Sequence, residues 1–282
     1  MKTAIITDST AFLSEELKNN PNLFIVPIPV IVDGKIYNEG IDIELGAYYE
    51  LLNNSKEFPT TSQPSIGEVL EMFSDIAKQG YEQAICIHLS SGISGFINNL
   101  TAMAPGIEEL KVYPFDSKIT SMPMGYMVET ALKMAEADES AEAILAKLDK
   151  MREDVEAYLV VDDLNILVRG GRLKNGAALI GSLLKIKPIL KFEDGSIVLS
   201  EKIRSTKKAL SRAEDIMVKR QKKSKNELKF FIIHANSLAI AELEKKEMEE
   251  MIPGIDIEIG QIGPVIGTHI GENAIVFACC GK

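Results

Sequence analysis

Apolar and polar positions follow two different periods along the first half of the chain, and each period predicts a different element. Short runs rich in β-branched and apolar residues, at 3–7, 84–87 and 111–115, have the length of buried strands. Residues 65–79 instead place an apolar side chain every three to four positions, which predicts an amphipathic helix. Further helices are expected after Gly95 and over 125–135 and 141–151. This alternation predicts an α/β domain with a mainly parallel, Rossmann-like sheet.

Two regions depart from that pattern. Residues 25–30 are extended but carry Pro27 and Pro29, which predicts a single edge strand. Beyond residue 157 the order of elements changes, since Glu193-Asp194-Gly195 separates two short strands in a hairpin pattern. A second, mixed α+β domain is therefore expected, with a boundary that divides the chain into 1–157 and 158–282. Its later elements are predicted as a helix over 206–219, a strand over 230–234, a helix over 238–251, and two last strands around 260–271 and 274–279.

Composition and charge exclude several classes of function. The chain has 282 residues and a formal net charge of −10, which argues against general nucleic-acid binding because that requires a basic face. No apolar stretch approaches the ~20 residues of a membrane span, so stable membrane insertion is not expected. The apolar run at the N-terminus is too short for a signal peptide. Three cysteines, two of them adjacent, form neither a disulfide framework nor a spaced metal site. A cytoplasmic protein is expected.

Two hydroxyl-rich turns carry the clearest chemical signal. One is Thr60-Thr61-Ser62-Gln63-Pro64-Ser65, and the other is Ser90-Ser91-Gly92-Ile93-Ser94-Gly95, which follows the predicted strand at 84–87. Ligands of open α/β sheets bind at the carboxyl ends of the strands. Neither turn contains Lys or Arg, so neutral O–H and N–H donors favour a carboxylate over a polyphosphate. The pair is interpreted as a clamp for an acidic head group, although the first turn is equally typical of a helix N-cap.

Other candidates follow strands or glycines. Asp8 and Asp116 each end a predicted strand, where a capping role explains them equally well. Arg169 and Arg172 flank a Gly-Gly pair, a pattern that suits contact with an anionic group but also an ordinary helix-to-helix turn. His269 lies between Gly267 and Gly271, near the C-terminus, and is a candidate to contact a ligand.

The order and spacing of these motifs resemble the DegV family of bacterial fatty-acid-binding proteins. The resemblance covers nearly the whole chain. It is carried by Ile6-Thr7-Asp8-Ser9, Thr61-Ser62-Gln63-Pro64-Ser65, Ser90-Ser91-Gly92-Ile93-Ser94-Gly95, residues 167–173, Gly181-Ser182-Leu183-Leu184 with 186–190, Lys202-Ile203-Arg204 and Ile266-Gly267-Thr268-His269. It departs from the family at Phe96-Ile97, where Thr-Tyr is common, at Gly271-Glu272-Asn273 in place of Gly-Pro-Gly, and at Pro123, where glycine is frequent.

The resemblance implies a carrier that holds a long-chain fatty acid between two domains and needs no cofactor. It implies that a separate ATP-dependent fatty acid kinase subunit phosphorylates the carboxylate of the bound acid. By motif position, Thr61 and Ser94 would hydrogen-bond that carboxylate, with Gly95 contributing backbone and His269 close to the head group. Ser62 and Ser91 belong to the same expected clamp. Arg169, Arg172 and Arg204 match basic positions at the mouth of the site or at the surface that docks the kinase.

Three alternatives stay open at this point. A serine hydrolase could use Ser94, Asp162 and His269, but Gly92-Ile93-Ser94-Gly95-Phe96 lacks the last glycine of the nucleophile elbow. An autonomous kinase is disfavoured because no P-loop sequence occurs. The third alternative is a binder of another small carboxylate.

Overall fold

The computed structural model describes residues 1–43, 45–179 and 186–282. Its first layer is a four-stranded parallel sheet in the order β2-β1-β6-β7. These strands span Leu23–Val26 (β2), Thr3–Asp8 (β1), Gln83–His88 (β6) and Lys111–Asp116 (β7). The two central strands, β1 and β6, are buried at every position because helices cover both faces. The sequence-based prediction of a parallel sheet is confirmed.

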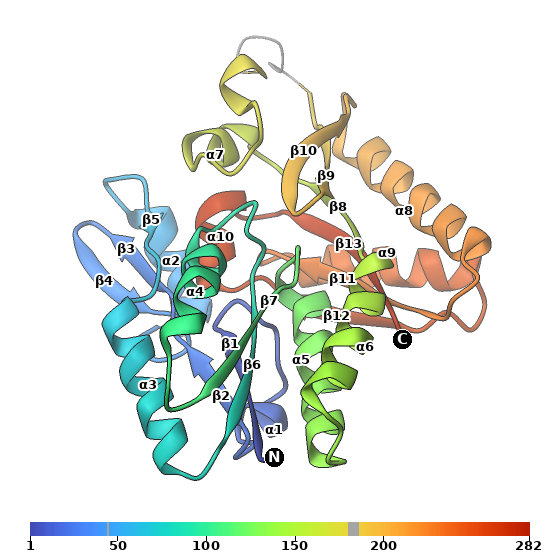
Figure 1. Cartoon of the computed structure of the whole chain (residues 1–282). Coiled ribbons are helices and arrows are strands. Elements are labelled where there is room, and N and C mark those ends of the chain that lie inside the picture. The colour runs from blue at the N-terminus through green and yellow to red at the C-terminus, as the bar shows by residue number, and fades with distance from the viewer. Residues whose placement is uncertain (44, 180–185) are drawn as a thin grey trace.

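Helices α3 (Ile66–Lys78) and α4 (Phe96–Met103) cover one face of this sheet, and α5 (Ser121–Glu136) covers the other (Figure 1). The division follows the period of the strand. Ala4 and Ile6 of β1 pack in the cluster that contains Phe73 of α3, whereas Ile5 belongs to the cluster that contains Met127 of α5. Helices α1 (Glu15–Lys18) and α6 (Ala141–Glu153) begin after Ser14 and Ser140, whose hydroxyls accept an N–H of the first turn.

The predicted edge strand at residues 25–30 is instead two strands in two sheets. β2 is an edge of the parallel sheet, as expected, but β3 (Pro29–Val32) is the centre of a separate three-stranded sheet, β4-β3-β5. Pro27 lacks an N–H, and the N–H of Ile28 donates to Ser9 Oγ at 3.1 Å, so the chain leaves the first sheet there. The other members are β4 (Lys35–Asn38) and β5 (Thr60–Thr61), and α2 (Leu45–Asn54) lies between them in the chain.

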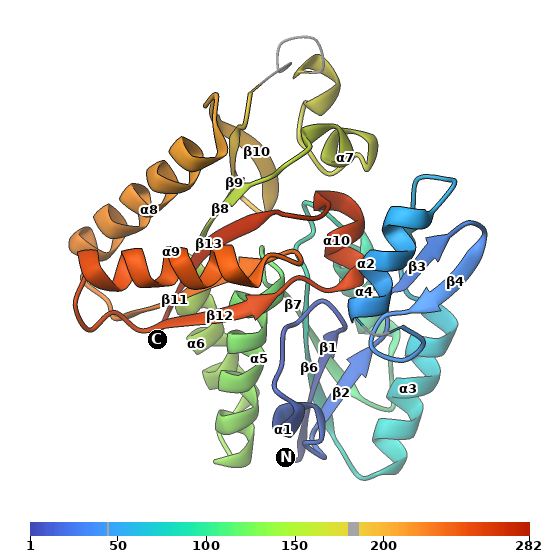
Figure 2. The same cartoon turned by 180° about the vertical axis from the view of Figure 1, so that it is seen from behind.

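A six-stranded mixed sheet forms the second layer, in the order β10-β9-β8-β13-β11-β12. All its neighbouring strands are antiparallel except β11 and β12. Helices α8 (Thr206–Lys223) and α9 (Leu238–Met251) cover one face, seen from both sides in Figures 1 and 2. The elements are β8 (Glu156–Val160), α7 (Leu164–Arg169), β9 (Ile189–Glu193), β10 (Ser196–Glu201), α8 (Thr206–Lys223), β11 (Leu228–His234), α9 (Leu238–Met251), β12 (Ile257–Gln261), α10 (Pro264–Ile270) and β13 (Ile275–Gly281), with 3-10 turns η1 (Ala104–Gly106) and η2 (Gly176–Leu179).

The predicted hairpin is confirmed, with Asp194 and Gly195 at positive φ (48° and 78°), as a tight two-residue turn requires. The expectation of a strand around 260–271 is only partly right. β12 ends at Gln261, and Pro264 then begins helix α10, because proline favours the first turn of a helix. The boundary predicted after residue 157 falls within β8 and stays a prediction. The motif Gly181-Ser182-Leu183-Leu184 lies outside the described residues.

Among the helices that the structure describes, none has the length and apolarity needed to cross a lipid bilayer.

Candidate ligand-binding site

The carboxyl ends of β1 and β6 are tied together by Asp8. Its Oδ2 accepts from the backbone N–H of Leu89 (2.9 Å) and lies 3.0 Å from His88 Nδ1, while Oδ1 accepts from the hydroxyl of Thr10 (2.6 Å). Asp8 is fully buried. Its carboxylate therefore organises the strand ends from which the following turn departs.

That turn is shaped by Ser90. The carbonyl of Ser90 accepts the N–H groups of Ile93 (3.1 Å) and Ser94 (3.0 Å), which folds the chain back before α4 begins. Gly95 occupies the N-cap position of α4. The two hydroxyl-rich turns lie side by side here, since a Cβ on Gly95 would lie 2.8 Å from Nε2 at the flexible end of the exposed Gln63 side chain.

A cavity opens between the parallel sheet and the six-stranded sheet, and its outline, which includes open solvent at the mouth, encloses about 870 Å³ of space free of protein atoms. Thr61, Ser62 and Gln63 line it from one turn, and Ile93, Ser94 and Gly95 from the other. The opposite wall consists of alternate residues of the second sheet. It contains Ala157 and Leu159 of β8, Ile233 of β11, and Val276 and Ala278 of β13.

The cavity has a polar, accessible end and an apolar, buried end. Ser62 and Gln63 are exposed, and Thr61, Ser94, Gly95 and Arg172 are partly exposed. The wall residues of β8, β11 and β13 are buried, as are Leu89, Ile119, Ile262 and Ile270. An amphiphile would therefore place its polar group among the hydroxyls and its hydrocarbon between the sheets.

His269 reaches the polar end from α10. Its Nε2 lies 2.8 Å from Thr61 Oγ1, and its ring is 8% exposed. Burial, with a smaller contribution from the nearby Arg172 charge, lowers the pKa of His269 to about 4, so the imidazole is neutral at pH 7.

The protonated nitrogen of that neutral ring follows from its surroundings. Nδ1 has no hydrogen-bond partner among the described residues and faces Gly170, where an added Cβ would lie only 2.6 Å away. A buried N–H without an acceptor is rare, so we assign the proton to Nε2. Thr61 Oγ1 then accepts from His269, and the Thr61 hydroxyl proton is free to point toward a ligand.

Arg172 is the one cation among the described lining residues. Its Nε donates to the carbonyl of Ile93 at 3.3 Å, and its Nη1 donates to the carbonyl of Gly170. Burial lowers the pKa of Arg172 but leaves the guanidinium charged at neutral pH. The site thus combines neutral hydroxyls with one positive charge, which suits a carboxylate.

Glu39 fixes α10, the helix that carries His269. Its Oε1 accepts the N–H of Val265 (3.0 Å) and its Oε2 accepts the hydroxyl of Ser9 (2.6 Å). Desolvation raises the pKa of Glu39 to about 7. This buried carboxyl group links the first strand end to the first turn of α10, and the sequence patterns did not single it out.

The remaining sequence candidates lie elsewhere. Ser91 is not among the described lining residues, and its hydroxyl donates to Asp116 Oδ2 at 2.6 Å. Arg169 is exposed and lines a separate surface groove beside α7 and α10. Arg204 is exposed and borders neither this cavity nor that groove.

The residues expected of a serine hydrolase do not assemble. His269 Nε2 pairs with Thr61, while Ser94 Oγ accepts the N–H of Phe96 at 3.4 Å. Asp162 forms an ion pair with Lys187 instead of orienting the histidine. No carboxylate within the described chain contacts His269 Nδ1, so the third member of a triad is missing.

The departures from the family pattern have structural roles of their own. Phe96 is fully buried and packs edge-on against His88, with ring centroids 4.8 Å apart. Glu272 accepts hydrogen bonds from Asn53 (3.0 Å) and Asn236 (2.6 Å), which holds the end of α10. Pro123 lines the cavity.

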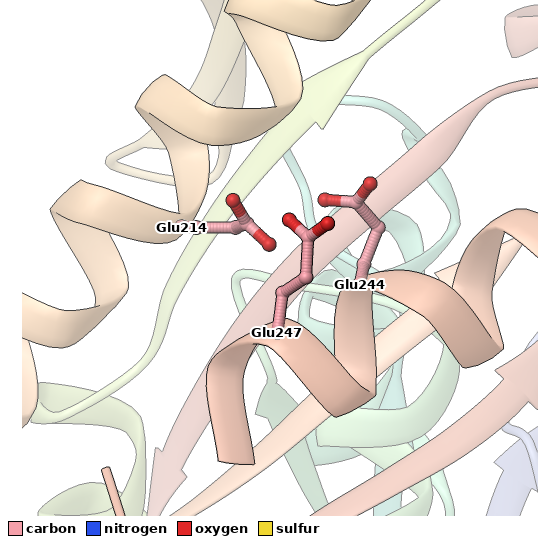
Figure 3. A group of neighbouring side chains, drawn as sticks. All are labelled: Glu214, Glu244 and Glu247. Carbon is pink, nitrogen blue, oxygen red and sulfur yellow. The ribbon is translucent and has the colours of Figure 1, made fainter. Parts of the chain in front are cut away.

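A group of acidic side chains lies on the other face of the second sheet. Glu214 of α8 and Glu244 and Glu247 of α9 each place a carboxylate oxygen within 4.8 Å of the others (Figure 3). Such oxygens could hold a divalent cation. Desolvation and the Glu244 carboxylate, however, raise the pKa of Glu214 to about 8, so a proton on this pair relieves the repulsion at neutral pH. Tyr158 and Val160 of β8 pack in the core cluster on that face, which separates the group from the cavity.

Comparison with known proteins identifies a family and relatives that match nearly the whole chain. The family model described as "Uncharacterised protein, DegV family" matches residues 2–282. A DegV domain-containing protein of Listeria innocua is 44% identical over 274 residues, which cover 97% of this chain and 96% of the relative.

Solved structures agree along the whole chain. The fatty acid binding DegV family protein of Streptococcus agalactiae is 39% identical with a TM-score of 0.94, over 100% of this chain and 99% of its own. DegV of Bacillus subtilis, described as a fatty acid binding protein, is 38% identical with a TM-score of 0.90, over 100% of both chains. The match of the family model, the relatives and the fold together show that this chain belongs to the DegV family.

Proposed function

We propose that this protein is a non-catalytic, cytoplasmic carrier of a long-chain fatty acid. One observation carries the proposal: the cavity between the sheets is apolar along its buried length and polar at its accessible end, where Thr61, Ser94 and His269 line it. The solved relatives described as fatty-acid-binding support the same ligand class.

The bound acid lies with its carboxylate between Thr61 and Ser94. Each acyl methylene that is buried contributes about 0.8 kcal/mol, so a chain of ~14 methylenes supplies roughly 11 kcal/mol before association costs. The hydroxyls need contribute only a few kcal/mol. Their role is to decide which end of the ligand remains accessible.

Calorimetric titration of delipidated protein with a long-chain fatty acid tests the assignment. Thr61→Val keeps the shape of the side chain but removes its hydroxyl, and we expect about tenfold weaker binding. Thr60→Val is the matched control, because Thr60 is the exposed neighbour and does not line the cavity. Equal affinities of the two variants would remove the head-group assignment.

The carrier presents its ligand to a separate ATP-dependent kinase subunit, which forms the acyl phosphate. The accessible position of the head-group end supports this step, and the exposed Arg169 and Arg204 provide cations at the surface for docking. With such a kinase subunit, ATP and loaded carrier, we expect Arg204→Ala to reduce acyl phosphate formation while its fatty acid content is unchanged. Undiminished product from both Arg169→Ala and Arg204→Ala would exclude these docking residues.

A further inference from the structure

The tip of the β9–β10 hairpin lies directly against the Ser90–Gly95 turn. The hydroxyl of Ser90 donates to the carbonyl oxygen of Gly195 at 2.7 Å, and both residues are buried. A Cβ on Gly92 would overlap the same Gly195 carbonyl. Gly92 and Gly195 therefore allow direct backbone contact between the turn after β6 and the β9–β10 hairpin, which belong to different sheets (Figure 1).

Each of these two elements carries part of the cavity wall. Ile93, Ser94 and Gly95 line it from the turn, whereas Phe192 and Ile197 line it from the two strands of the hairpin. All of them except Ile197 are partly exposed, so both elements reach the accessible end of the cavity, beside the buried contact between Ser90 and Gly195. The Arg172 hydrogen bond to Ile93 is a second tie in the same region.

The strands of the second sheet that form the opposite wall are held much more firmly. Residues of β8, β11 and β13 cannot move apart without breaking the ladder of the six-stranded sheet. Among the described residues, the turn and the hairpin tip are joined instead by the hydrogen bond from the Ser90 hydroxyl and by close packing. Separation of these two elements therefore breaks far fewer hydrogen bonds than separation of the strands.

We propose that Ser90 and Gly195 form a latch across the accessible end of the cavity, and that release of this latch limits how fast an acyl ligand enters and leaves. The inference rests on the proposed function. A latch of this kind adds to the barrier for both directions of exchange, because it must open for entry as well as for exit. It does not change the contacts of the bound ligand, so the dissociation constant is unaffected.

Stopped-flow exchange of a fluorescent long-chain fatty acid tests the latch in the full-length protein. Ser90→Ala removes the bond to Gly195 and also the bond that Ser90 Oγ accepts from the Gly92 N–H within the turn (3.2 Å). Loss of the one bond between the two elements corresponds to about a fivefold faster opening, so the association and dissociation rate constants should rise together by about that factor. Gly92→Ala is a second variant that leaves Ser90 in place, since its Cβ would lie 2.3 Å from the Gly195 carbonyl oxygen and part the two elements. Ser91→Ala is the control, because its hydroxyl bonds Asp116 within the first sheet.

The outcomes separate the latch from the proposed function. Parallel acceleration of both rates, with a dissociation constant within about twofold of wild type, supports the latch. The latch is overturned if the variant rates equal those of Ser91→Ala, or if only the dissociation rate constant changes. Neither result affects the proposal that the protein binds a fatty acid. If the wild-type protein binds no fatty acid, the proposed function fails and the latch fails with it.

Discussion

Thr61 Oγ1 and His269 Nε2 lie 2.8 Å apart although 208 positions separate the two residues in the chain. Thr61 comes from β5 of the small sheet and His269 from α10, which follows β12, an edge strand of the second sheet. This contact joins the two halves of the fold at the polar end of the cavity. It also orients a threonine hydroxyl whose proton is available to a ligand.

The buried imidazole makes stability depend on acid pH. The pKa of His269 is about 4 when folded and 6.5 ordinarily, so between these values only the unfolded chain takes up the proton. The full contribution of the neutral imidazole to the free energy of unfolding is present above pH 6.5. As the pH falls toward 4, at most roughly 3 kcal/mol of that free energy is lost. Urea unfolding of wild type and His269→Gln from pH 4 to 7 should show a difference in the free energy of unfolding that becomes smaller as the pH is lowered. A constant difference would refute the depressed pKa.

Gly170 provides the space that His269 occupies. A Cβ there would lie 2.6 Å from His269 Nδ1, so Gly170→Ala should displace the ring and cost roughly 1–3 kcal/mol of unfolding free energy. Gly106→Ala is the control, since its Cβ would meet no atom within 4 Å. Thermal unfolding and fatty acid titration measure both effects. Equal behaviour of the two variants would show that the ring does not depend on this glycine.

Arg172 should make the site prefer an acid over a neutral lipid. Its guanidinium is the one positive charge among the described lining residues, and a charge-assisted contact contributes about 1–3 kcal/mol. We expect Arg172→Gln to weaken binding of a fatty acid about tenfold, but that of the corresponding fatty alcohol much less. Competition binding with the two ligands gives the ratio. If the variant binds both ligands more weakly by the same factor, Arg172 acts through packing and not through its charge.

The acidic group between α8 and α9 predicts an opposite dependence on pH. The pKa of Glu214 is raised to about 8, so the folded state holds a proton that the unfolded state loses above about 4.5. Stability from this group therefore falls as the pH rises toward 8. Glu214→Gln should be less sensitive to alkaline pH than wild type, whereas Glu250→Gln, at an exposed position of α9, should follow wild type. Parallel stability curves for all three proteins would contradict the shared proton.

Local patterns predicted most elements of the fold because their signals are local. The helix after Ser65, the Asp194-Gly195 hairpin and the buried strands at β1 and β6 all follow from period, capping or turn chemistry. The separation of β2 from β3 was not predictable from two prolines alone, because it depends on Ser9 accepting the N–H of Ile28. Helix α10 was missed because seven residues between glycines give too short a period to recognise.

The candidate site could be predicted only in part, for a similar reason. The two hydroxyl-rich turns, together with motif positions in the family resemblance, pointed to Thr61 and Ser94, and both line the cavity. Ser91 belongs to the same turn, but the choice between Ser91 and Ser94 depends on Asp116, which comes from the neighbouring strand. The residues of the apolar cavity wall could not be predicted for another reason. Alternation along β8 shows that Ala157 and Leu159 share a face, but not that this face borders a cavity.

Mass spectrometry of lipid extracted from the purified protein tests the central claim most directly. The account predicts about one long-chain fatty acid per chain, largely lost from the Thr61→Val/Ser94→Ala double variant and retained by Thr60→Val/Ser91→Ala. Wild-type protein that carries no fatty acid, and takes none up after delipidation, would contradict it.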